Sequence, residues 1–142
     1  MPSFSGPHHL ALSVSDRAAS ARWYRTVLGF AFVKEFEEGI PRILQVHVAS
    51  NFFISLYNHP DRPTESFDPR RTGLDHIALA VASDDDLADW SAALDDLHVA
   101  HSPIRDLGHA RFISLEDPDG IQIELWRTII PFHPADLSSV PS

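Results

Sequence analysis

An internal repeat governs what this chain can fold into. Residues 9–14 (HLALSV) are echoed by residues 76–81 (HIALAV), and Trp23 and Trp90 follow the two histidines at equal distances. Each copy alternates large apolar residues with small ones, which is the period-two pattern of a strand whose two faces differ. Self-similarity of this kind predicts two related structural modules in tandem.

The two modules should share one order of elements. The first strand is followed by Ser15 or Asp16 as a helix cap, and its second copy by Ser83, each before an apolar stripe of helical spacing. Gly29 suits the end of the first helix. The period-two pattern then returns at residues 31–37, 42–48, 52–57, 99–104, 110–115 and 121–126. The prediction is an α+β fold made of two βαβββ modules.

A length of 142 residues is typical of one domain. We expect a single domain over residues 1–142. The expected parts are module one at about 7–58, a linker at about 59–73, module two at about 74–127 and an irregular tail at 128–142. The sequence DPDG, beginning at Asp117, predicts a tight turn before the last strand.

Charge and composition exclude several partners. Eleven basic and twenty acidic residues give a net charge of −9, which disfavours binding to nucleic acid or to anionic lipid. No secretory signal and no apolar run of membrane-spanning length is apparent, so we expect a cytoplasmic protein with no membrane partner. Cysteine is absent, so any metal must be held by His, Asp, Glu or water.

Three potential metal ligands fall on one predicted face. His9 and His76 occupy matching positions on the small-residue face of their strands, and Glu124 lies opposite the apolar residues of the last strand. An unpaired buried carboxylate is costly, so Glu124 needs a partner. Two imidazoles and one carboxylate form the facial triad of non-haem iron proteins. We expect a divalent metal, with Fe(II) favoured and Mn, Zn, Ni or Co as alternatives. The competing interpretation is two ordinary polar residues at strand starts and one solvated carboxylate at an edge.

The same face assignment predicts a pocket for a small-molecule substrate. Aromatic walls with a few polar groups suit a small organic ligand, although packing at an interface would explain the aromatic residues equally well. His8 should point away from His9, because side chains alternate along a strand. The expected lining residues are Gln45, His47, Phe53, Ser55, Tyr57, Phe112, Ser114, Gln122 and Trp126.

Residues 9–16 (HLALSVSD), 76–81 (HIALAV) and 117–125 (DPDGIQIEL) carry a family resemblance. Together they resemble the signatures of the vicinal oxygen chelate superfamily, which groups glyoxalases, bleomycin resistance proteins and extradiol dioxygenases. The resemblance implies paired βαβββ modules that curl into an open barrel around a divalent metal, with helices on the convex face, often in a homodimer. It also implies that His9, His76 and Glu124 are the metal ligands.

Two positions depart from better-known members of that superfamily. Ser55 stands where glyoxalase I and related epimerases have a fourth ligand, and Ser114 stands where ring-cleaving dioxygenases usually have a tyrosine. Three ligands leave room for both substrate and dioxygen. We therefore expect a metal-dependent enzyme acting on a small oxygenated molecule, with dioxygenase-like chemistry slightly ahead of glyoxalase-like lyase or isomerase chemistry. Glu124 would mainly balance the metal charge, with a role as general base as the alternative. The competing function is a metal-free, drug-sequestering protein of the bleomycin-resistance type.

Overall fold

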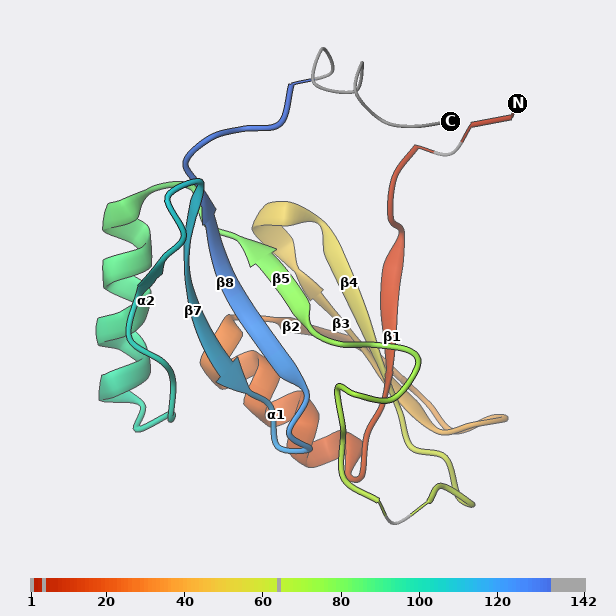
Figure 1. Ribbon diagram of the computed structural model, residues 1–142. Helices are drawn as coiled ribbons and strands as arrows, with labels where there is room; N and C mark the ends of the chain where they lie inside the picture. Colours follow the sequence, from red (N-terminus) through yellow and green to blue (C-terminus); the bar gives the residue numbers. More distant parts are fainter. Residues whose placement is uncertain (1, 4, 64, 134–142) are drawn as a thin grey trace. The chain divides into compact units, whose positions relative to one another are not determined.

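The computed structural model describes residues 2–3, 5–63 and 65–133, and the chain divides into two compact units (Figure 1). Unit 1 is formed within Met1–Asp68 and Asp117–Ile121, and unit 2 within Pro69–Glu116 and Gln122–Ser142. The elements in chain order are β1 (His9–Ser13), α1 (Arg17–Leu28), β2 (Ala31–Phe36), β3 (Arg42–His47), the short 3-10 helix η1 (Val48–Ser50), β4 (Phe52–Tyr57), β5 (Ile77–Ala80), α2 (Asp84–Asp96), β6 (Arg105–Asp106), β7 (Ala110–Glu116) and β8 (Gln122–Thr128).

The strands form two four-stranded sheets with the same topology. The first sheet has the order β1-β4-β3-β2 and the second the order β5-β8-β7-β6. In each sheet the first strand of the module runs parallel to the last, and the remaining neighbours are antiparallel. The predicted α+β class and the βαβββ order of both modules are confirmed. Both sheets are mixed and open, and neither closes into a barrel.

Helix α1 begins and ends where its sequence signals lie. The Asp16 side chain accepts hydrogen bonds from the Ala18 and Ala19 backbone amides, so Asp16, rather than Ser15, is the cap. Gly29 follows the helix with a φ of 74°, a left-handed conformation that glycine adopts without strain. The helix packs on β3 and β4 and buries Tyr24, among others, beneath the sheet.

Helix α2 repeats this arrangement in unit 2. The Ser83 hydroxyl accepts from the Asp86 amide, as predicted, and acidic residues fill the first turn, where the helix dipole favours negative charge. Leu87 and Leu94 are buried, and the helix packs on β7 and β8. Each sheet therefore has one face covered by its own helix and one face turned away from it.

The alternation predicted for the repeated strands is confirmed. In β1 and just beyond it, Leu12 and Val14 are buried whereas His9, Ala11 and Ser13 are exposed. Ile77 and Leu79 of β5 are likewise less exposed than Ala78 and Ala80 between them. Residues directly opposed on neighbouring strands share a face. The strand register therefore decides which further side chains lie with the histidines.

The strand predicted at residues 99–104 is wrong. This stretch makes only an isolated bridge between His101 and Leu115, and the regular strand β6 is two residues long and begins at Arg105. Pro103 has no backbone N–H and cannot continue a ladder. The Ser102 hydroxyl accepts instead from the Ser114 amide at 2.9 Å. The edge of the second sheet is therefore short.

The DPDG segment forms the predicted turn between β7 and β8, and it belongs to unit 1. One oxygen of Asp117 accepts from the amides of Asp119 and Ile121, at 2.8 and 2.9 Å. The other oxygen accepts from the Tyr24 hydroxyl at 3.1 Å. Asp119 in turn accepts from the Ser15 amide at 2.9 Å. Side chain and backbone together attach this late segment to the beginning of the chain.

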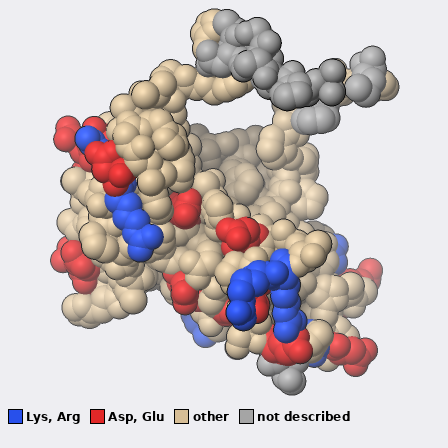
Figure 2. Space-filling model, in the orientation of Figure 1, with Lys and Arg blue, Asp and Glu red and all other residues tan. Residues whose placement is uncertain are grey.

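The segments outside the modules are irregular where the structure describes them. The predicted linker at 59–73 contains neither helix nor strand in its described residues, and β8 extends one residue into the predicted tail. Residues 134–142 of that tail lie outside the described residues. No helix in the described ranges has the length and apolar character of a membrane span. Figure 2 shows basic side chains beside acidic ones on the visible face.

Candidate metal and substrate site

Two of the three predicted metal ligands lie together in unit 2. The Nε2 atom of His76, just before β5, is 3.5 Å from an Oε atom of Glu124 on β8. The pairing of Ile77 with Ile123 and of Ala78 with Glu124 brings the start of β5 beside that carboxylate. Ligand atoms about 2.0–2.2 Å from one ion lie about 2.8–3.1 Å apart in an octahedral shell and about 3.3–3.6 Å apart in a tetrahedral one. The observed spacing matches the tetrahedral range, and a small side-chain movement would bring it into the octahedral one.

Asp75 orients the His76 ring, a role that the sequence analysis did not assign. Its carboxylate lies 2.6 Å from His76 Nδ1, so that nitrogen donates and Nε2 faces Glu124. This hydrogen bond first, and the charge of Glu124 after it, raise the pKa of His76. Histidines that bind metals commonly donate their other ring N–H to a carboxylate in this way. The sequence signal was an acidic residue immediately before a candidate ligand.

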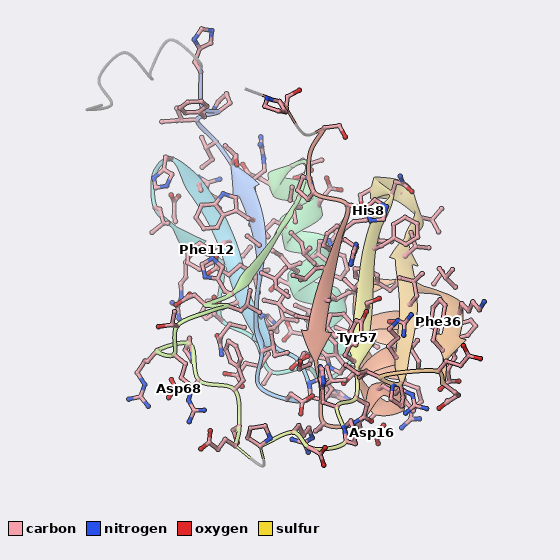
Figure 3. The ribbon with its side chains drawn as sticks, turned by 90° about the vertical axis from the view of Figure 1, so that its right-hand side faces the viewer. His8, Asp16, Phe36, Tyr57, Asp68 and Phe112 are labelled. Carbon is pink, nitrogen blue, oxygen red and sulfur yellow. The ribbon has the colours of Figure 1, made fainter. Side chains whose placement is uncertain are left out.

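His9 begins β1 in unit 1, on the face opposite the helix. Its Nδ1 lies 2.9 Å from Nδ1 of His8, which Figure 3 labels, and the His8 ring stacks on Phe53 at 6.4 Å between centroids. The expectation that His8 points away from His9 is wrong, because His8 precedes the strand and does not follow its alternation. Among the described residues, no group of three His, Cys, Asp or Glu side chains is placed to hold a metal ion. Convergence of His9 with His76 and Glu124 therefore stays a prediction.

The second module supplies the predicted aromatic wall. Phe112 on β7 opposes Trp126 on β8, and their rings stack at 5.3 Å with an angle of 22° between their planes. Ser114 opposes Glu124 in the same register, so both share the face of the wall. The predicted face assignment holds for this module, including Gln122, whose amide donates to Glu116 at 2.7 Å. Glu124 thus lies on the same face as Trp126, two residues before it along β8.

In the first module, the face predicted for β3 is wrong. Gln45 opposes Ile54, is 1% exposed, and donates to the Ala21 carbonyl of α1 at 2.9 Å. His47 opposes Phe52, and its ring lies 5.8 Å from that of Phe30. Both side chains therefore lie on the helix-covered face and cannot line the predicted pocket. The side-chain amide of Gln45 was predicted on the exposed face because the sequence of β3 does not reveal that the Ala21 carbonyl accepts its hydrogen bond.

The β4 residues of the predicted lining lie on the His9 face. Phe53, Ser55 and Tyr57 oppose His9, Ala11 and Ser13 of β1, respectively. The corresponding β3 residues on this face are Arg42, Leu44 and Val46. The predicted lining did not include these three residues, and Arg42 is the polar one among them.

Comparison with known proteins finds relatives in sequence and in fold. Residues 6–125 match the family model described as the Glyoxalase/Bleomycin resistance protein/Dioxygenase superfamily. The uncharacterised protein YwkD of Bacillus subtilis is 32% identical over 126 residues, which cover 84% of this chain and 94% of YwkD.

Two solved structures illustrate the likeness in fold. A glyoxylase/bleomycin resistance protein/dioxygenase domain from Frankia sp. EAN1pec has a TM-score of 0.81 and 28% identity, covering 89% of this chain and 99% of its own. A lactoylglutathione lyase from Agrobacterium tumefaciens has a TM-score of 0.69 at 16% identity, covering 87% of this chain and 93% of its own. At that identity the lyase shows a shared fold alone.

Proposed function

Because the chain belongs to the glyoxalase/bleomycin resistance protein/dioxygenase superfamily, which contains enzymes, we propose that it is a divalent-metal-dependent enzyme acting on a small oxygenated organic substrate. The observation that carries this proposal is the contact between His76 and Glu124 at 3.5 Å, with Asp75 holding the other ring nitrogen. A histidine that only faces solvent needs neither Glu124 at one ring nitrogen nor Asp75 at the other. Together they form a ligand pair with its supporting hydrogen bond.

The proposed ligands are His76, Glu124 and, from the first module, His9. An imidazole nitrogen and a carboxylate oxygen suit Fe(II), Mn, Zn, Co and Ni, and we favour Fe(II) for a set of two histidines and one carboxylate. A bound ion would supply Lewis-acid activation and a template for adjacent substrate oxygens. Glu124 contributes one negative charge, which leaves a net positive site for an anionic chelating substrate.

The aromatic wall orients the substrate beside Glu124. Trp126 is partly exposed and stacks on the buried ring of Phe112, and the His109 ring lies 6.3 Å from Trp126. Such a surface binds planar organic groups and excludes water from the charged side chains next to it. The same wall favours the second candidate, a metal-free ligand-binding protein, which would have no use for the His76–Glu124 pair.

Among reactions, we favour dioxygenase-like chemistry over lyase or isomerase chemistry. Ser55 takes the place in β4 that Glu124 has in β8, since each opposes an alanine of the first strand in its module. A serine hydroxyl is a poor ligand for these ions. The proposed metal therefore has three protein ligands, which leaves coordination positions for substrate and dioxygen. Comparing substrate turnover with and without oxygen separates the two classes of reaction.

Metal analysis tests the proposal directly. We expect untagged protein, purified without chelators and then reloaded, to bind one divalent ion per chain. His76→Ala and Glu124→Gln should each weaken binding of Mn(II) by 10-fold or more, because each removes a ligand. Glu116→Gln makes the same charge change in the neighbouring strand and is the matched control. Equal affinity in all four proteins, or the absence of saturable binding, would favour the metal-free candidate.

A further inference from the structure

A row of alternating cations and aromatic rings crosses the face of the first sheet that carries His9. Phe36 on β2 opposes Arg42 on β3, which opposes Tyr57 on β4. The Arg42 guanidinium lies 4.2 Å from the Phe36 ring centre and 5.5 Å from that of Tyr57. The row continues at both ends, because Lys34 lies 4.9 Å from the Phe36 ring and His59 stacks on Tyr57 at 6.0 Å. Figure 3 labels Phe36 and Tyr57, on the strands flanking β3.

Arg42 differs from two other arginines in what it contacts. Arg17 donates to two carboxylates of β2 and the segment after it, and Arg111 donates to Asp84 and Asp106. Arg42 donates to the Ile40 carbonyl at 3.3 Å, and its other described contacts are the two rings. A guanidinium attracted to aromatic rings in this way still has N–H groups in its plane that can donate to an oxyanion.

The second module shows that the sheet does not need a cation at this place. There the corresponding row is Arg105 on β6, Phe112 on β7 and Trp126 on β8, in the same cross-strand order. Phe112 fills the middle position that Arg42 fills in the first module. A phenyl ring therefore satisfies the packing of this strand position, and the charge of Arg42 calls for a different explanation.

The row lies on the same face as the proposed ligand His9. Tyr57 opposes Ser13 and Phe53 opposes His9, so the two positions are separated along β4 by Ser55 and its neighbours. Four residues of strand span about 13 Å. A small molecule of about that length can therefore reach both ends of this face.

We propose that Arg42, clamped between Phe36 and Tyr57, binds an oxyanion group of a small-molecule ligand through paired hydrogen bonds. A carboxylate and a phospho group have the same chemistry here, because each offers two oxygens to the planar fork. Arg42 is then a specificity-determining residue that selects anionic over neutral substrates. The identity of the ligand as a substrate rests on the proposed function, whereas binding of the oxyanion does not require a metal.

The test uses metal-free full-length protein, so it does not depend on turnover. Benzoate, phenylphosphonate and the neutral benzamide are titrated while the arginine Nε–H signals are followed by NMR. We expect saturable shifts of the Arg42 signal with at least one anion and none with benzamide. The anion that binds more tightly identifies the group as carboxylate or phospho.

Matched variants separate a specific site from general charge. Arg42→Gln should weaken anion binding by about tenfold or more, and Arg42→Lys should weaken it less because it keeps the charge without the fork. Arg62→Gln makes the same charge change in the linker and should alter affinity less than about twofold. Equal losses in Arg42→Gln and Arg62→Gln, or unchanged affinity in folded Arg42→Lys and Arg42→Gln, would overturn the proposal. Metal binding would be unaffected by that result, just as loss of the metal proposal would leave this anion site standing.

Discussion

Replacing Tyr24 by phenylalanine should destabilise the fold through one buried hydrogen bond. The Tyr24 hydroxyl donates at 3.1 Å to Asp117, which is 5% exposed and whose other oxygen already accepts two backbone amides. Burial, and after it the charge of Asp117, raise the pKa of Tyr24 far above its usual range, so the hydroxyl remains a donor. The substitution keeps the ring and removes only this donor.

The expected loss follows from the charge of the acceptor. Hydrogen bonds to charged groups contribute about 1.5–3 kcal/mol, and because Asp117 retains two other donors we expect about 2 kcal/mol. For a chain of this length that corresponds to a fall in Tm of about 6–8 °C. Tyr57→Phe removes a hydroxyl for which no hydrogen bond is described, and it should change stability by less than about 0.5 kcal/mol.

The pH dependence gives a second signature. Burial raises the pKa of Asp117, so between its unfolded and folded values the folded chain binds more protons. The free energy of unfolding that this group contributes is therefore present below the unfolded pKa and is lost as pH rises through the folded pKa. The Tyr24 bond favours the carboxylate, so the cost of Tyr24→Phe should be largest near neutral pH and smaller once Asp117 is protonated.

Urea denaturation of wild type, Tyr24→Phe, Tyr57→Phe and Asp117→Asn at several pH values measures these differences. Asp117→Asn cannot titrate and should lack the pH-dependent term. If Tyr24→Phe cost no more than Tyr57→Phe at every pH, the reasoning about this buried bond would be refuted.

Four further outcomes are expected. Asp16→Ala should lower the free energy of unfolding by about 1 kcal/mol in urea, because the two amides capped by Asp16 lose their acceptor. Gln45→Leu should change stability by less than about 1.5 kcal/mol, because it loses the bond to Ala21 but also removes a buried, unpaired amide oxygen; metal and anion titrations should be unchanged. Glu124→Gln should lose activity together with metal affinity, and excess metal should restore part of the rate. Full metal occupancy without turnover in this variant would instead make Glu124 the general base. Ser55→Glu should add a fourth ligand and slow any oxygen-dependent turnover. As the family resemblance implies, we propose a homodimer; sedimentation at micromolar concentration should give the mass of two chains, and the mass of a monomer would refute this proposal without affecting the metal site.

Local signals in the sequence were sufficient for the architecture. The repeated strand, the caps at Asp16 and Ser83 and the turn at Asp117 each depend on residues close in sequence, and each is found where it was predicted. The small-residue face of the first strand of each module also follows from local alternation. In the second module the same alternation was enough to predict the face of Glu124, which lies beside the start of β5.

The errors arose where a distant partner decides the outcome. In β3 both faces mix polar and apolar residues, and the carbonyl of Ala21 determines that Gln45 is buried. His8 stacks on Phe53 of another strand, which local alternation does not reveal. The ring contacts of Arg42 are non-local in the same way, because its two rings come from β2 and β4.

The attachment of residues 117–121 to the first unit has a consequence for the order in which the chain folds. Tyr24 and Asp117 are 93 residues apart, and closing a loop of that length costs about 4 kcal/mol in chain entropy, so this contact should form late. During synthesis the amino-terminal half emerges first, but its tyrosine has no protein acceptor until the turn before the last strand has been made. Although the two halves look like copies, the first cannot be released as a free-standing protein without losing that acceptor.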